Sequence, residues 1–139
     1  MNLAISFRRS LGLALPLIAA LAGCGSGGVD LASVEGQVLL DGRPLAGGVV
    51  TTLPAQGRGA RGELDEQGRF TLSSGSLGPG AAIGVHRVAV IAVADTGQLS
   101  PEAPKKLLTP EKYANPETSG LTIDVQPGAN SAVLKLDSN

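Results

Sequence analysis

The chain has 139 residues, a net charge of −1 and a single cysteine, and only 2% of its residues are aromatic. This length suggests one domain, and a single cysteine excludes an intramolecular disulfide. The near-neutral charge and the absence of a basic run exclude the electrostatic footprint of a nucleic-acid-binding protein. Hydrophobic residues make up 42% of the chain, too many for a wholly disordered protein, so the core must be built from aliphatic side chains.

The first 23 residues predict a signal peptide that is removed on export. Arg8 and Arg9 supply its positive start, and a largely apolar stretch follows at 11–22. This stretch is too short for a transmembrane helix, which needs about 20 residues, and it fits the apolar region of a signal peptide. The adjacent arginines leave both the general and the twin-arginine export routes open.

The signal peptide ends at Leu21-Ala22-Gly23-Cys24, which resembles the lipobox of bacterial lipoproteins. The resemblance implies that Cys24 is acylated and becomes the first residue of the mature protein. Each buried methylene then contributes about 0.8 kcal/mol of membrane affinity. Gly25 follows the cysteine in place of aspartate, which by analogy favours the outer membrane, at its periplasmic or outer face. The alternative is an ordinary secretory signal with a cysteine here by chance.

Residues 24–31 are predicted to form the acylated cysteine and a flexible tether, and residues 32–139 a single domain. Within this domain, short apolar runs alternate with residues that favour tight turns, such as Asp41-Gly42. This pattern predicts an all-β, seven-stranded β-sandwich. Residues 58–73 are expected to form a hairpin, and 121–125 and 131–136 are expected to form a final hairpin through the turn Pro127-Gly128. The seven predicted strands lie at residues 34–40, 49–53, 57–64, 69–72, 84–94, 121–125 and 131–136.

Residues 95–120 form a long connection that several prolines interrupt. Lys105-Lys106-Leu107-Leu108 is predicted to form one helical turn within it. Tyr113 is expected to anchor the connection against the sandwich through its ring, with its hydroxyl finding a partner. Phe70, the only phenylalanine after the predicted signal peptide, is expected to insert into the core.

Three motifs carry a resemblance to a known family: Val34-Glu35-Gly36-Gln37-Val38, the glycine-rich stretch 42–50, and the segment 65–70. They are similar to the carboxypeptidase regulatory-like domain. The resemblance covers about residues 34–93 and implies an immunoglobulin/transthyretin-like sandwich. The segment 110–121 is also similar to one in small lipoproteins of planctomycete-type bacteria that carry this domain.

We assign no catalytic residue, metal ligand or cofactor. One transthyretin-like branch, hydroxyisourate hydrolase, is catalytic, and the resemblance implies for it a site with more than one histidine, an arginine and a Tyr-Arg-Gly-Ser ending. This chain has His86 as its single histidine and ends Leu-Asp-Ser-Asn. We interpret His86 as a side chain at a strand edge rather than a ligand. The serines at 73–76 have no base in a nucleophile arrangement. Asp65-Glu66 is interpreted as part of a β-turn rather than a calcium site.

The favoured function is a membrane-anchored, non-catalytic binding or structural module that contacts an envelope protein or polysaccharide. An exposed edge strand would take such a partner by strand addition. The alternative is an envelope enzyme or accessory subunit with a site in the 95–120 connection, because long loops are uncommon unless functional. A carbohydrate-binding module is the weaker variant, because sugar sites favour aromatic platforms. The candidate residues of the enzyme alternative are Glu102, Lys105, Lys106, Glu111, Lys112 and Glu117.

Overall fold

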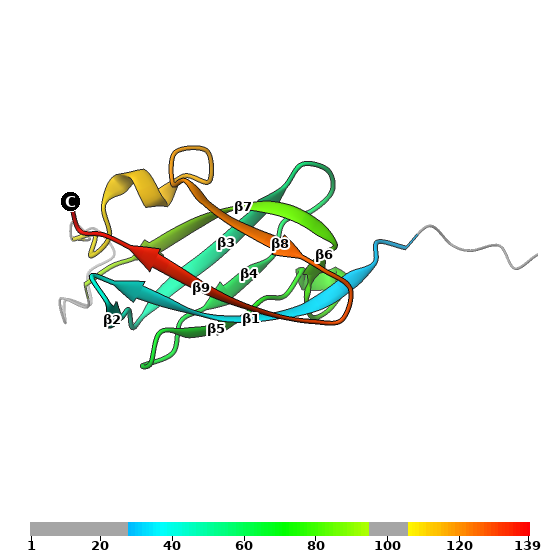
Figure 1. Ribbon diagram of the computed structural model, residues 1–139, viewed down its shortest axis with the longest axis horizontal. Coiled ribbons are helices and arrows are strands. Elements are labelled where there is room, and N and C mark those ends of the chain that lie inside the picture. The colour runs from blue at the N-terminus through cyan, green and yellow to red at the C-terminus, as the bar shows by residue number, and fades with distance from the viewer. Residues whose placement is uncertain (1–27, 95–105) are drawn as a thin grey trace, which may run out of the picture.

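The computed structural model describes residues 28–94 and 106–139, which form strands arranged in two sheets (Figure 1). The all-β prediction is confirmed. Cys24 and the predicted signal peptide 1–23 lie outside the described residues. The strands are β1 (Leu31–Leu40), β2 (Arg43–Pro44), β3 (Gly48–Pro54), β4 (Arg61–Glu63), β5 (Arg69–Thr71), β6 (Ala81–Ala82), β7 (Gly84–Ala92), β8 (Leu121–Val125) and β9 (Ala129–Leu136). Two short 3-10 helices are present, η1 (Gly75–Leu77) and η2 (Glu111–Ala114).

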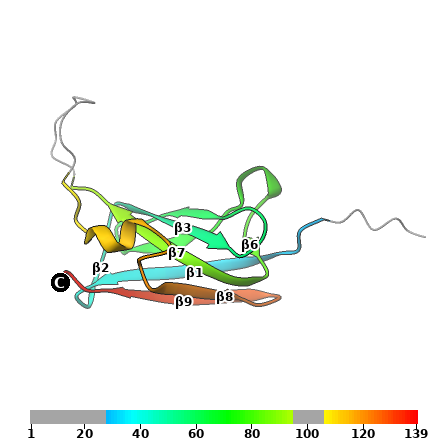
Figure 2. The same cartoon turned by 90° about the horizontal axis from the view of Figure 1, so that it is seen from above.

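The first sheet is organised around β1. Along one edge β1 pairs in succession with three short antiparallel strands, β6, β5 and β2. Along the other edge it pairs with β9, which runs parallel to it from Ser33↔Ala129 to Leu40↔Leu136. The second sheet has the order β4-β3-β7-β8, and all its neighbours are antiparallel. The two sheets enclose a common core in a β-sandwich-like arrangement, and β8 at the edge of the second sheet lies beside β9 of the first (Figure 2).

The described residues contain nine strands, so the predicted count of seven is not confirmed. Each of the seven predicted segments contains one strand. The two additional strands, β2 and β6, are only two residues long and owe their assignment to pairing with β1. Two residues cannot show the alternation of apolar and polar side chains that identifies a strand in a sequence.

The predicted hairpin around residues 65–68 has its turn, but its two arms belong to different sheets. β4 pairs with β3 and β5 pairs with β1, so the backbone hydrogen bonds between the arms are confined to the turn and to the bridge Arg61↔Ser73. Gly62 lets the arms pass closely, since a Cβ there would lie 2.7 Å from the carbonyl oxygen of Thr71. The hairpin prediction was therefore wrong in its pairing, because each arm finds a longer partner strand in its own sheet. The predicted final hairpin of 121–125 and 131–136 was wrong for the same reason, since β8 pairs with β7 and β9 pairs with β1.

The core lies between the two sheets and is almost wholly aliphatic. Val34 and Val38 of β1 are completely buried, as their spacing predicts. Phe70 is 3% exposed, which confirms its predicted place in the core. Its ring lies against Gly36, where a Cβ would be 2.5 Å from both the ring and the carbonyl oxygen of Ala132. A glycine in the middle of the central strand thus makes room for the phenylalanine.

His86 is completely buried, so its interpretation as a strand-edge side chain was wrong. Its Nε2 lies 2.7 Å from the carbonyl oxygen of Ala82, which can only accept, so Nε2 carries the hydrogen. Its Nδ1 lies 3.1 Å from Thr52 Oγ1, and in the neutral imidazole with the hydrogen on Nε2 it accepts the hydroxyl hydrogen. Thr52 Oγ1 in turn accepts the Ala60 N–H at 3.0 Å. The histidine has a structural role, since its two ring nitrogens link Thr52 of β3 to Ala82 of β6.

The 95–120 connection returns to the sandwich where the structure describes it. Residues 106–108 lie extended beside the end of β7, with a bridge Val93↔Leu107, so the predicted helical turn at 105–108 was wrong. Lys106 accepts from the Ala94 N–H and Leu108 donates to the Ala92 carbonyl, and these bonds favour extended backbone. Tyr113 of η2 is buried and its hydroxyl accepts the Asp137 N–H at 3.1 Å, as predicted.

We predict that Thr52→Val lowers the free energy of unfolding by about 1–3 kcal/mol. The substitution leaves two buried groups unpaired, the Nδ1 of His86 and the N–H of Ala60. Thr51→Val is the matched control, because Thr51 is an exposed neighbour on the same strand and its change is expected to stay within about 0.5 kcal/mol. Urea unfolding measures both, and equal effects would contradict the proposed role of the hydroxyl.

Candidate functional site

The charged residues predicted for an enzyme site in the connection do not form one cluster where the structure describes them. Glu102 and Lys105 lie outside the described residues. Lys106 and Glu111 are exposed. Lys112 donates to a backbone oxygen of Asn139, and Glu117 pairs with Arg87 of β7 at 3.3 Å. The two residues with partners are thus engaged separately, on different elements.

The serine and acidic candidates bond to their own loops. Ser74 is buried and its hydroxyl donates to the carbonyl oxygen of Gly80, and Ser73 donates to that of Gly78. Asp65 Oδ1 accepts the backbone N–H groups of Gln67 and Arg69, which closes the predicted turn. These contacts support local structure rather than chemistry on a substrate. Within residues 28–94 and 106–139, no three His, Cys, Asp or Glu side chains lie close enough to hold a metal ion.

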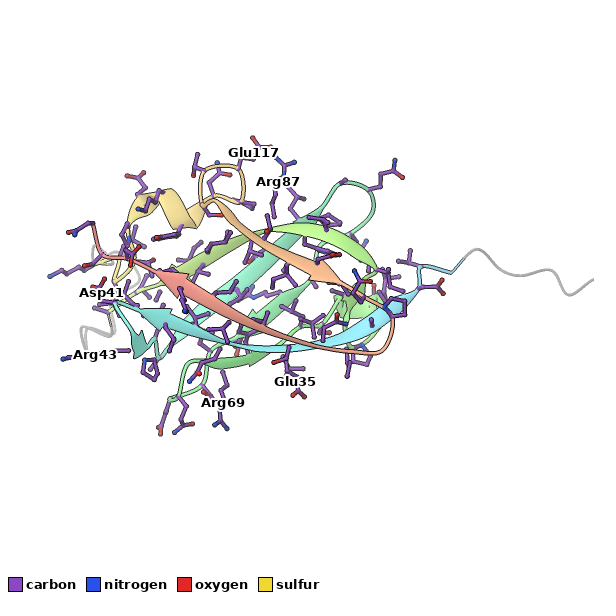
Figure 3. All side chains as sticks on the ribbon, viewed as in Figure 1. Glu35, Asp41, Arg43, Arg69, Arg87 and Glu117 are labelled. Carbon is purple, nitrogen blue, oxygen red and sulfur yellow. The ribbon has the colours of Figure 1, made fainter. Side chains whose placement is uncertain are left out.

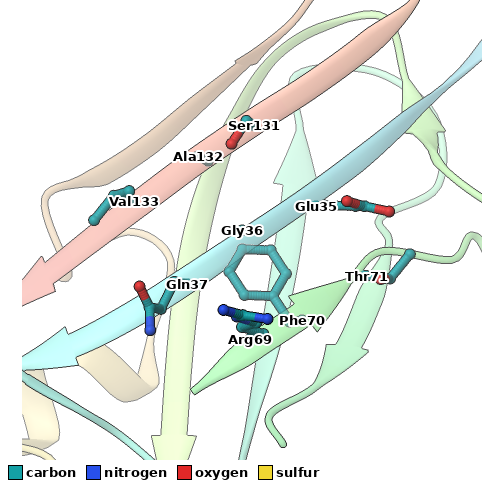
Figure 4. A pocket seen from close by; sticks show the side chains of 9 residues that line it. All are labelled: Glu35, Gly36, Gln37, Arg69, Phe70, Thr71, Ser131, Ala132 and Val133. Atoms are coloured by element: carbon teal, nitrogen blue, oxygen red, sulfur yellow. The ribbon is translucent and has the colours of Figure 1, made fainter. Parts of the chain in front are cut away.

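The outer face of the first sheet has a shallow hollow of about 420 Å³ (Figure 4). The strand register places two rows of side chains across this face. Thr71, Glu35 and Ser131 form one row, and Arg69, Gln37 and Val133 form the other. We call these six residues the outer face. They offer one carboxylate, one guanidinium and several neutral hydrogen-bonding groups, a composition suited to polar contact with a partner.

The edge of β9 next to this face is unpaired, because β9 pairs only with β1 among the described strands. Leu136 directs its carbonyl toward β1, where it accepts the Asp41 N–H, and the Asp137 N–H points the other way, to Tyr113. Since this direction alternates along a strand, four residues of β9 direct their N–H and C=O groups outward, Ala129 at its start and then Ser131, Val133 and Lys135. We call the last three the free edge.

Aromatic platforms are missing from this surface. The two aromatic side chains of the described residues, Phe70 and Tyr113, are 3% and 5% exposed. A sugar ring stacks on exposed aromatic faces. The described surface therefore gives the carbohydrate-binding alternative little support.

A second hollow, of about 430 Å³, lies at the turn between β1 and β2. Asp41 and Gly42 have φ angles of 50° and 79°, the left-handed pair that a tight two-residue hairpin turn requires. Asp41 also accepts the backbone N–H of Ser138 at 3.0 Å. Hydrogen bonds from Ser138 hold the pKa of the Asp41 carboxyl below its ordinary value of 3.8. The carboxylate thus fastens the segment after β9 to this turn.

Comparison of the chain with protein-family models, with curated proteins and with solved structures gave no match. In the part of the chain that the structure describes, no helix is long and apolar enough to cross a membrane.

Sequence reasoning did not find the free edge or the outer face. The alternation of Ser131 to Leu136 identifies a strand, but not its neighbours. Which edge is free depends on the pairing of β9 with β1, whose partners Val34 and Asn130 are far apart in the chain. The sequence signal was the alternation of Ser131, Val133 and Lys135 with apolar residues. It identifies the outward-facing side chains of the strand, but it does not show which edge of the strand is unpaired.

We predict that the stability advantage of the wild type over Asp41→Asn is largest well above pH 4 and shrinks as the pH falls. The folded-state pKa of Asp41 is lowered, so its contribution is complete above the unfolded value of 3.8 and is lost as the pH falls through the folded value. Asparagine keeps the left-handed turn, so turn geometry is preserved in the comparison. Urea unfolding midpoints from pH 6 to pH 3 measure the effect, and a constant difference would contradict it.

Proposed function

We propose that this chain is a membrane-anchored lipoprotein of the cell envelope whose β-sandwich is a non-catalytic contact module. The single observation that carries the contact role is the free edge of β9. It presents unpaired backbone groups of Ser131, Val133 and Lys135 beside an exposed valine side chain. Exposed edges of this kind accept an additional strand from a partner, with backbone hydrogen bonds supplying the affinity.

The partner we propose is an extended segment of an envelope protein. The outer face next to the edge supplies side-chain contacts on alternate positions of an added strand. Val133 is 57% exposed and offers an apolar contact, while Glu35 and Arg69 on the neighbouring strands offer charges of both signs (Figure 3). Lys135 places a charge on this edge, and edge lysines disfavour the addition of a second identical edge.

The proposed anchor is the acylated Cys24, and the proposed location is the outer membrane. Support comes from the lipobox-like Leu21-Ala22-Gly23-Cys24 and from the apolar stretch at 11–22 ahead of it. The likeness of residues 34–93 to the carboxypeptidase regulatory-like domain supports an immunoglobulin/transthyretin-like sandwich, a fold that serves as a contact module. We propose no catalytic residue and no cofactor.

We predict that Cys24→Ala moves the protein from the membrane fraction to the soluble fraction of cells that express it. The cysteine sulfur and the new amino terminus are the atoms that would carry the acyl chains, and two or more chains give lasting attachment. Mass spectrometry of the wild-type amino-terminal peptide measures the modification directly. An unmodified cysteine at this terminus, or a membrane-bound Cys24→Ala protein, would contradict the anchor.

We predict that Val133→Pro abolishes cross-links between this protein and its partner in intact cells, while the fold is kept. The N–H at position 133 points away from β1, so proline removes a hydrogen bond to the partner and none within the sheet. Val133→Thr is the matched control, because it keeps both the N–H and the branched side chain.

The urea unfolding midpoint of each Val133 variant separates lost contact from lost folding. Cross-links that persist in a folded Val133→Pro protein would contradict the use of this edge. Hydrolytic activity of the purified wild type on a substrate panel, abolished by alanine at His86 or Ser74, would contradict the non-catalytic role.

A further inference from the structure

Four large apolar side chains are exposed on segments around β6 and the starts of β1 and β7, which lie at one end of the sandwich (Figure 1). Val29, Leu77, Ile83 and Val85 are 51%, 47%, 43% and 57% exposed. We call these four residues the apolar end. An isolated exposed apolar side chain is ordinary, but a group of them marks an interaction surface.

Contacts between separate segments bring these residues to the same end. The Ile83 N–H donates to the carbonyl oxygen of Asp30, next to Val29, and Leu31–Ala32 pairs with β6 just ahead of Ile83. The loop that contains η1 packs on the start of β1, since a Cβ at Gly78 would lie 3.9 Å from the Leu31 side chain. Val85 follows at the start of β7.

The segments that carry the apolar end contain little charge of their own. Residues 28–31 and 75–85 contain one charged residue, Asp30. Two charged side chains of other segments flank them: Asp124 of β8 lies opposite Val85 in the strand register, and Arg58 donates to the hydroxyl of Ser76 in η1 at 3.2 Å. The labelled Asp41 and Arg43 lie at the opposite end of the molecule (Figure 3). An apolar surface with charged groups only at its rim matches the boundary between acyl chains and headgroups.

The chain leading to this end is short. Six residues, 25–30, separate Cys24 from the start of β1, and four of them are Gly25, Ser26, Gly27 and Gly28. Six residues of a glycine-rich random coil have an average end-to-end distance of about 13 Å. A lipid on Cys24 would therefore hold the apolar end, rather than any other surface, next to the bilayer.

We infer that the apolar end rests on the lipid surface, with Val29, Leu77, Ile83 and Val85 among the headgroups. This inference rests on the proposed acylation of Cys24. Contact through this end orients the long strands away from the membrane, because β1 and β9 both begin there. The free edge then extends outward from the bilayer, where a partner can reach it.

Two valines with the same exposure test this inference. Val85 of the apolar end and Val133 of the free edge are each 57% exposed, so cysteine at either position is tolerated by the fold. Each variant of the full, acylated protein is labelled with a fluorophore and reconstituted into phosphatidylethanolamine–phosphatidylglycerol vesicles with brominated acyl chains. We expect the label in Val85→Cys to lose about half of its fluorescence, since it lies at headgroup depth. The label in Val133→Cys is expected to be unaffected.

The outcomes are distinguishable. If the protein floats with the vesicles and both labels respond equally, the inference is overturned and the anchor is kept. If the wild-type protein does not float with the vesicles, the proposed anchor fails and the inference fails with it. If the label at 85 is shielded without vesicles and the protein cross-links to itself there, the occupant is a second copy of the chain, which also overturns the inference.

Discussion

The structure depends on strand β1, which pairs along both of its edges. Four other strands hydrogen-bond to it, three short antiparallel ones on one side and the parallel β9 on the other. At the middle of β1, Gly36 has no side chain, and the Phe70 ring therefore lies directly against the strand. Because β1 uses both of its edges, the outer edges of the first sheet lie on its neighbours, β9 on one side and the short strands β6, β5 and β2 on the other. The free edge is thus a consequence of how the core is built.

The low aromatic content shapes the molecule as much as the strand order does. Of the two aromatic residues described, Phe70 fills the core and Tyr113 fastens η2 to the chain after β9. Both aromatic side chains are buried, so the surface of the described residues consists of aliphatic and polar groups. Such a surface suits backbone pairing along an edge and contact with lipid, and it offers little to a sugar ring. This surface is in keeping with the contact role that we propose.

Buried polar groups join segments that the two sheets alone would leave loose. His86, Thr52 and Ala60 share one set of hydrogen bonds that ties β3, β7 and the segment before β4 together. From the sequence, we interpreted the lone histidine beside Arg87 as a strand-edge residue. The alternation of side chains along a strand does not reveal that Thr52 and Ala82 supply hydrogen-bond partners for a buried imidazole. Burying an imidazole is tolerated only when both nitrogens are bonded, as they are here.

The sequence by itself determined the all-β class, the approximate places of the seven longer strands, the core position of Phe70 and the anchoring role of Tyr113. These follow from local alternation, turn residues and the scarcity of aromatic side chains. Only the tertiary structure decided that the arms of 57–64 and 69–72 join different sheets, that β9 runs parallel to β1, and which edge stays free. The physical reason is that pairing joins residues as distant as Ser33 and Ala129, and local patterns carry no information about such partners.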